Sequence, residues 1–424
     1  MLKKHLLIAF LIGMFGLNTA LAQRDNRSQE KNVVTTVGND RADSGDVENA
    51  FKNVAPDSPH ENGLPRFAIV GKDNMFYLGI GAQLLGEVVF DQGDEMPSAI
   101  YMTPSAITQK TPGNGGNTRF AWQSSSIYLN FVALPSTDNQ TGLFFKANFT
   151  GSNNFSVYHL YAKYRGLTVG YTASAFTDGA AEPMTIDYEG PNGYPYLTLF
   201  TAYWTQNFNK HFSGAIGIDA PSASITTGTG SLAVNQRIPA IPLYLQYALA
   251  DKSAHIRLSG LVRPLQYRNS VAEKNNSIVG WGLQLSGMTN IIGGLSFQFN
   301  GAYGKAFGNY LQDDNGLGLD AVPITNAGEL KPVTSLGLTG GLSYQFDCGI
   351  TANMVYSHLS NWLPEKASVA GDTYRYGDYC AANVIYALNK FISCGVEYDY
   401  GHRKSFDGVG LHTNRIQAQF AVTF

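Results

Sequence analysis

Charged side chains recur at every second position in several short segments, and these are the residues best suited to chemistry. In residues 254–263, His255, Arg257 and Arg263 occupy odd-numbered positions, while apolar residues such as Ile256 occupy even-numbered positions. A row of positive charges on one face attracts anions and can guide them along a wall. Seven basic residues fall on the polar rows of their segments: Lys146, His159, Lys163, His255, Arg257, Arg263 and Arg415.

An acidic loop complements this basic set. Residues 177–197 combine four carboxylates with a turn sequence. If this loop faces the basic wall, acid and base would set up a field across a narrow passage. The competing interpretations are an ordinary surface loop, and basic residues that only solvate a wet interior or pair with Glu397 and Asp399. The loop residues concerned are Asp178, Glu182, Asp187 and Glu189, followed by the turn residues Gly190, Pro191, Asn192 and Gly193.

Covalent catalysis and metal chemistry are weakly indicated. His358, His402 and His412 are placed where an outer rim would lie, but no motif pairs them with a serine or acid nucleophile. There is no H-E-x-x-H sequence of the kind that binds zinc in metalloproteases. The sequence therefore predicts no catalytic residues, no metal site and no cofactor, and a protein that is not an enzyme.

The cysteines and the net charge argue against further classes. Cys348, Cys380 and Cys394 are too few and too scattered for a disulfide framework or a Cys-rich metal site. A formal net charge of -3, with no basic arm, argues against a nucleic-acid partner. The mean hydropathy of -0.12 excludes a protein built of several membrane helices.

The elements that must position the charges are predicted to be strands. In the last ten residues, Ile416, Ala418, Phe420, Val422 and Phe424 alternate with polar side chains, which indicates a strand between two different solvents. The same alternation of apolar and polar residues recurs from Met75 onward and predicts sixteen strands. They lie near residues 75–91, 119–133, 142–150, 155–164, 167–175, 198–206, 213–219, 240–249, 254–263, 277–287, 292–303, 335–346, 350–358, 375–387, 391–400 and 413–424.

The links between these strands alternate in length. Links such as 165–166 and 347–349 are short, whereas the intervening ones, such as 177–197 and 305–334, are mostly long; 151–154 is the exception. Short turns at one rim and long loops at the other are typical of an up-and-down outer-membrane barrel. A β-sandwich or propeller has no reason to alternate in this way. We therefore predict an all-β transmembrane antiparallel barrel of sixteen strands.

The amino-terminal part has a different composition. Residues 1–22 have the layout of a secretory signal peptide with a small-residue cleavage site before Gln23. Residues 23–66 are polar and predict a flexible periplasmic extension, in which 47–54 could make a short helix without any sustained heptad pattern. The barrel is predicted to occupy residues 67–424.

Two stretches resemble the DcaP-like outer-membrane porins, in a form familiar from Bacteroidetes. They are residues 67–81, Phe-Ala-Ile-Val-Gly-Lys-Asp-Asn-Met-Phe-Tyr-Leu-Gly-Ile-Gly, and residues 186–193, Ile-Asp-Tyr-Glu-Gly-Pro-Asn-Gly. The resemblance implies a trimeric porin with a folded-in third loop, in a family that favours small anions such as dicarboxylates. The family's amino-terminal coiled coil has no counterpart in the heptad-free residues 23–66.

The expected function is passive diffusion through a water-filled lumen narrowed by the third loop, in the cell outer membrane. The solutes would be small and hydrophilic, anions among them. The expected partners are outer-membrane lipid, two further copies in a homotrimer, the barrel-assembly machinery and small anionic solutes. The alternatives are an adhesin or structural barrel that acts through its long loops and, with less support, an outer-membrane hydrolase.

Overall fold

The computed structural model describes residues 34–36, 43–58, 64–151 and 154–424. The predicted signal peptide, and most of the predicted extension before residue 43, lie outside the described residues.

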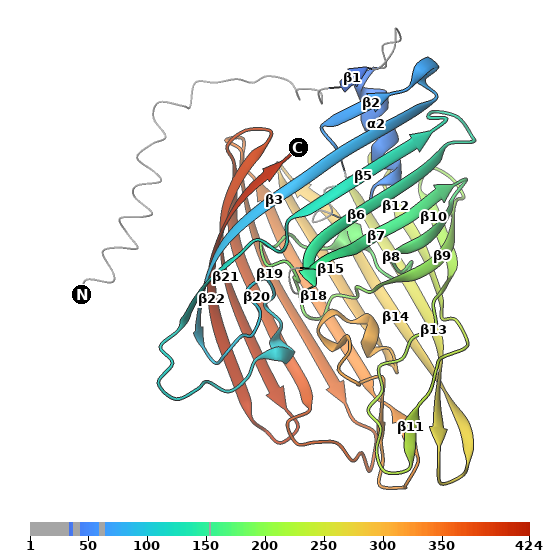
Figure 1. Ribbon diagram of the computed structural model, residues 1–424, viewed down its shortest axis with the longest axis vertical. Helices are drawn as coiled ribbons and strands as arrows, with labels where there is room; N and C mark the ends of the chain where they lie inside the picture. Colours follow the sequence, from blue (N-terminus) through green and yellow to red (C-terminus); the bar gives the residue numbers. More distant parts are fainter. Residues whose placement is uncertain (1–33, 37–42, 59–63, 152–153) are drawn as a thin grey trace, which may run out of the picture.

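The described residues form a closed antiparallel barrel of sixteen strands, which confirms the predicted fold (Figure 1). The last strand pairs with the first, so that Arg415 lies opposite Asp91 and the ring of barrel strands is closed. Two of the sixteen strands are each interrupted and carry two labels, β4 with β5 and β11 with β12. The barrel strands are β3 (Phe76–Gly93), β4 (Asn117–Ala121), β5 (Ser126–Ala133), β6 (Thr141–Gly151), β7 (Asn154–Tyr164), β8 (Leu167–Ala173), β9 (Thr198–Asn207), β10 (Phe212–Asp219), β11 (Ser231–Ala233), β12 (Ile241–Ala248), β13 (Ala254–Asn269), β14 (Lys274–Ile292), β15 (Leu295–Lys305), β18 (Thr334–Gln345), β19 (Ile350–Trp362), β20 (Tyr374–Ala387), β21 (Ile392–Ser405) and β22 (Gly410–Thr423).

Alternation along most strands separates an apolar exterior from a polar interior. On β14 the side chains of Leu283 and Leu285 are 54% and 47% exposed, while Gln284 between them is 1% exposed. On β21 Val396 and Tyr398 face outward, and Glu397 is buried inside. An apolar exterior suits lipid, and charged groups avoid the hydrocarbon by pointing into the lumen.

The two rims differ as predicted. In Figure 1 the short turns lie at the upper rim, with both β1 and β2, and the long loops lie at the lower rim. Several strands run further toward the long loops than predicted: β14 begins at Lys274, and β19 ends at Trp362. Hairpin pairing continues beyond the lipid because backbone groups gain partners there as well.

Long loops fold back into the barrel. Residues 177–197, called loop 3 below, contain η3 (Gly179–Ala181), and most of them are buried. Residues 306–333 also turn inward, and Leu311 of this segment makes a bridge to Pro195 of loop 3. The shorter elements in the long loops are η2 (Pro104–Ala106), η4 (Gly308–Tyr310), η5 (Gln312–Asp314), β16 (Ala321–Pro323) and β17 (Leu330–Pro332).

The amino-terminal segment contains helix α2 (Ser44–Val54). This helix includes residues 47–54, where the sequence allows a short helix. The Asp43 side chain caps the helix by accepting a 2.7 Å hydrogen bond from the Gly45 amide. Residues 44–54 of the predicted extension are thus helical and packed on the barrel, because α2 has an apolar face to bury. The remaining elements before the barrel are β1 (Val34–Thr36), which runs parallel to β2 (Phe67–Val70), and η1 (Lys72–Asn74). Among the described residues, no helix is both long and apolar enough to cross a membrane.

Candidate functional site

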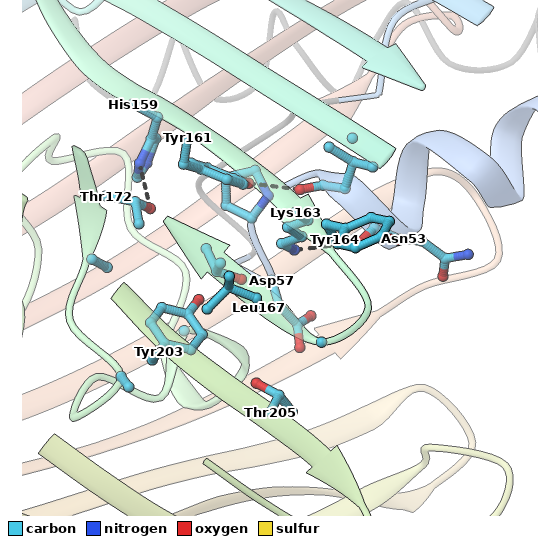
Figure 2. Close-up of a pocket in the computed structure, with 18 of the residues that line it drawn as sticks. Asn53, Asp57, His159, Tyr161, Lys163, Tyr164, Leu167, Thr172, Tyr203 and Thr205 are labelled. Atoms are coloured by element: carbon cyan, nitrogen blue, oxygen red, sulfur yellow. Dashed lines mark hydrogen bonds between the residues drawn. The ribbon is translucent and has the colours of Figure 1, made fainter. Parts of the chain in front are cut away.

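A cavity of about 730 Å³ lies inside the barrel, bounded by the end of α2, the inner faces of β7 to β9 and the start of loop 3. Figure 2 shows side chains from these elements around this space. Tyrosines, hydroxyls and charged groups dominate the lining, so the surface suits a hydrated solute. The polar lining residues include Asp57, Ser58, His159, Tyr161, Lys163, Thr168, Thr172, Tyr203, Tyr244 and Arg257.

His159 and Lys163 reach the cavity from one strand, β7, because residues four apart on a strand share a face. His159 Nδ1 lies 3.0 Å from Thr172 Oγ1. Lys163 Nζ donates to the backbone oxygens of Asn53 at 3.3 Å and Ala55 at 3.4 Å, at the carboxyl end of α2. A cation there interacts favourably with the helix dipole and orders the helix end beside the cavity.

Arg257 enters the cavity from β13. Its guanidinium carbon lies 4.2 Å from the centre of the Tyr244 ring, and its Nε donates to Gln246 Oε1 at 2.7 Å. Arg257 Nη1 also donates to Thr177 O at 3.0 Å, where loop 3 begins. Ring stacking and hydrogen bonding together hold this charge in one position at the cavity wall.

Asp178 of loop 3 is fully buried against the same wall. His255 Nε2 lies 2.9 Å and Ser286 Oγ 2.6 Å from Asp178 Oδ2, and Arg257 Nη1 lies 3.5 Å from Oδ1. Burial by itself raises the pKa of Asp178, but the Arg257 charge and the hydrogen bonds from His255 and Ser286 outweigh it and hold the pKa below its usual value. The predicted loop acid therefore contacts the predicted wall bases directly.

The other predicted bases lie elsewhere on the inner wall and are not among the residues that line this cavity. Lys146 is buried, with Nζ 5.4 Å from the centre of the Tyr158 ring. Arg263 Nη1 pairs with Asp320 at 2.7 Å. Arg415 Nε pairs with Asp91 at 2.7 Å, and its Nη2 donates to Ser98 O at 2.6 Å. Each of these two arginines is thus held by a carboxylate and covered by a long loop.

The remaining acids of loop 3 fasten the loop at several points. Glu182 Oε2 accepts a 2.6 Å hydrogen bond from Ser58. Asp187 Oδ1 accepts from the Met102 amide at 2.8 Å, and burial, with the nearby Glu397 charge, raises its pKa to about 7. Glu189 accepts a hydrogen bond from the Thr103 hydroxyl, and burial raises its pKa well above its usual value.

The turn of loop 3 reaches the opposite wall. Gly190 has φ +78°, a conformation that favours glycine. Asn192 Nδ2 donates to Gly377 O of β20 at 3.0 Å, and the Gly193 amide donates to Ser357 Oγ of β19 at 2.9 Å. Loop 3 leaves the barrel wall at β8 and returns at β9, so these contacts make it span the lumen.

Sequence reasoning missed part of this cavity. Tyr161, Tyr203 and Tyr244 lie on inward rows and could have been selected by parity alone. Asp57 and Ser58 could not, because their position depends on how α2 packs inside the barrel.

A separate polar chain lies on the outward face of β19 and β20. His358 Nε2 lies 2.7 Å from Ser360 Oγ, and His358 Nδ1 lies 2.8 Å from Asp378 Oδ1. Asp378 also accepts from the Tyr356 hydroxyl at 2.9 Å and lies 3.1 Å from His402 Nδ1. A serine, a histidine and a carboxylate linked in this order could activate the serine oxygen.

Comparisons with known proteins place the fold. No protein-family model matches the sequence, and no curated protein matches it. The solved outer membrane channel DcaP of Acinetobacter baumannii is 17% identical, with a TM-score of 0.72 over 83% of this chain and 99% of that chain. OmpT, an outer membrane protein of Vibrio cholerae, is 10% identical, with a TM-score of 0.53 over 84% of this chain and 99% of that chain. The chain thus has a β-barrel fold similar to that of the outer membrane channel DcaP, and its apolar exterior fits a location in the outer membrane.

Proposed function

We propose that the protein is a porin through which small hydrophilic solutes, anions among them, diffuse passively, with loop 3 narrowing the lumen. The observation that carries this proposal is the polar cavity inside the barrel, where Lys163 and Arg257 face a space bounded by loop 3. A barrel of about sixteen strands is wide enough for an aqueous channel, and an inserted loop reduces its width.

The preference for anions follows from which charges are compensated. Asp178 is buried against His255 and Arg257, so this cluster holds two basic side chains against one carboxylate. Lys163 adds a second cation with its ammonium group on backbone oxygens, and Asp57 on the same cavity offsets only part of the positive charge of Lys163 and Arg257. A wall of this composition attracts anions into the lumen.

We further propose that the protein works as a homotrimer, is inserted by the barrel-assembly machinery and admits small anionic solutes. Apolar side chains such as Phe200, Leu245 and Met354 cover the exterior and suit contact with lipid or another barrel. The exposed apolar row of β22, which includes Ile416 and Phe420, supports recognition by assembly machinery, as for outer-membrane proteins generally.

Planar-bilayer recording under a salt gradient tests this proposal. We expect discrete conductance steps and a reversal potential on the anion side. Liposome swelling with neutral sugars and with dicarboxylates then measures which solutes pass. Purified, folded protein that gives no conductance in bilayers would overturn the porin function.

The Ser360–His358–Asp378 chain supports a second candidate, an acyl-ester hydrolase facing outer-leaflet lipid. Ser360 Oγ would attack the ester carbonyl while His358 Nε2 takes the hydroxyl proton and passes it to the departing alcohol; water then hydrolyses the acyl-serine. A fluorophosphonate probe tests this. We expect an adduct on Ser360 that is absent in Ser360→Ala and His358→Asn, and an unlabelled Ser360 in the folded protein would refute it.

A further inference from the structure

The inner wall of the barrel has an apolar patch near the short-turn rim. Tyr77, Tyr128, Val132, Phe144 and Tyr161 lie on inward rows of β3, β5, β6 and β7, and each is at most 4% exposed. A wall that faced water here would be expected to carry polar side chains. The patch therefore needs a cover.

Helix α2 supplies this cover. Its buried face, with Val47, Ala50, Phe51 and Val54, packs against the patch in one apolar cluster. Gly142 of β6 lies so close that a Cβ there would be 3.1 Å from the Val54 Cβ. The side of α2 that includes Lys52 and Asn53 stays exposed.

Hydrogen bonds fix the helix end on the wall. The Tyr161 hydroxyl donates to Val54 O at 2.7 Å, and Asn130 Nδ2 donates to Phe51 O at 3.0 Å. Together with the Lys163 bonds to Asn53 O and Ala55 O, the Tyr161 bond to Val54 O satisfies carbonyls that a helix end leaves without intrahelical partners. Phe51 O accepts from the Ala55 amide as well as from Asn130.

The chain after α2 continues along the cavity and reaches loop 3. Ser58 donates to Glu182 of loop 3, and the Asp57 carbonyl lies so near Gly179 that a Cβ there would be 2.3 Å from the oxygen. Asp57 itself is exposed and lines the cavity (Figure 2). Its carboxylate is therefore a negative charge on the same space as Lys163.

The geometry points to residues 44–58 as a fixed inner wall of the pore and to Asp57 as a residue that sets its charge selectivity. This inference rests on the proposed porin function. The segment stays in place while solutes pass, because leaving would expose the apolar patch and the helix face together. Asp57 then offsets part of the positive potential of Lys163 and Arg257, which makes the pore less anion-selective than its basic residues alone would.

A disulfide tests whether the segment stays in place. Val54→Cys with Gly142→Cys brings two Cβ atoms to 3.1 Å, a few tenths of an ångström below the usual range for disulfides. The background carries serine at the three native cysteines, which are free thiols in the structure. We expect the cross-link to form in outer membranes, and the oxidised channel to show the conductance and reversal potential of the reduced channel.

Variants of α2 provide the matched control. Phe51→Glu places a carboxylate at a position that is 1% exposed, so it should release the helix and abolish the cross-link. Asn49→Glu adds the same charge at an exposed position of the same helix and should leave the cross-link intact. A cross-link that persists in Phe51→Glu, or is absent from the parent pair, overturns the docked helix.

Asp57→Asn tests the selectivity role. Removing one charge near the solute path should increase the anion-to-cation permeability ratio about twofold near 0.1 M salt. The same substitution should have no effect once Phe51→Glu has released the segment. An unchanged ratio for Asp57→Asn alone refutes the role of Asp57, and a cross-linked channel that conducts only after reduction refutes the fixed wall. Cross-linking without any conductance in the parent protein would instead refute the porin function.

Discussion

Two arginines of β13 offer a direct test of which charges a permeating ion meets. Arg257 and Arg263 have the same parity on one strand, and sequence alone gives them the same role. In the structure Arg257 lines the cavity, whereas Arg263 is 1% exposed and paired with Asp320 at 2.7 Å. We therefore expect Arg257→Gln to shift selectivity toward cations. Arg263→Gln combined with Asp320→Asn should leave selectivity unchanged, because it removes a neutral pair.

The size of the Arg257 effect follows from the position of its guanidinium at the wall. A unit charge about 8 Å from an ion changes its energy by about 0.5 kcal/mol in water, and salt near 0.1 M roughly halves this. The change has opposite signs for anions and cations. The anion-to-cation permeability ratio should therefore fall about twofold at 0.1 M salt, and the change should shrink at 1 M salt.

Reversal potentials in planar bilayers, measured under the same salt gradient for each variant, decide between the outcomes. The double substitution at the Arg263 pair avoids leaving an unpaired buried carboxylate, which would destabilise the loop around residue 320. Thermal unfolding of both variants checks that the barrel is intact. An unchanged ratio for Arg257→Gln, or an equal shift for both variants, would refute the assignment of the ion path to this cavity.

Three further substitutions test how loop 3 is held. Asp178→Asn should raise the anion-to-cation permeability ratio, opposite in sign to Arg257→Gln, because it frees the guanidinium charge. Asp187 has a pKa raised to about 7 in the docked loop. The docked state should therefore lose stability as pH rises from about 4 to about 7. Open-channel current noise should be larger at pH 8 than at pH 5 in the parent protein, and equal at both pH values in Asp187→Asn. Gly193→Ala would place a Cβ 2.5 Å from a backbone oxygen of β19 and should displace loop 3 at a cost of about 1 to 3 kcal/mol, seen as faster proteolysis of the loop. The control Gly115→Ala has open space around it and should not change the proteolysis of loop 3.

The barrel could be predicted from sequence because two simple constraints dominate it. Lipid on one side and water on the other impose an alternation that repeats in every strand, as in residues 277–287. A closed up-and-down barrel has alternating short turns and long loops, and each of them joins two neighbouring strands. The order of strands around the barrel therefore follows their order in the sequence. Strands such as β14 extend further at their outer ends than predicted. Beyond the lipid both faces of a strand meet water, so the sequence there lacks the alternation of apolar and polar residues.

The candidate site could be predicted only in part. Parity correctly places Arg257 and Arg263 on one inner face, but it cannot tell an open lumen from a lumen filled by a folded loop. The pairing of Arg263 with Asp320 joins segments more than fifty residues apart and depends on how residues 306–333 pack. Likewise, the Ser360–His358–Asp378 chain requires a cross-strand register that no local motif encodes.

The position of α2 suggests how such filled regions can be recognised in other barrels. An inward row that faces water should be polar, yet the inward rows near the short-turn rim carry Tyr128, Val132 and Phe144. This departure from the expected alternation cannot come from lipid, because the opposite parity of the same strands already meets it. An apolar inward row therefore indicates a segment of the chain packed inside the barrel. In this sequence the amphipathic stretch 47–54 is the segment that fits it.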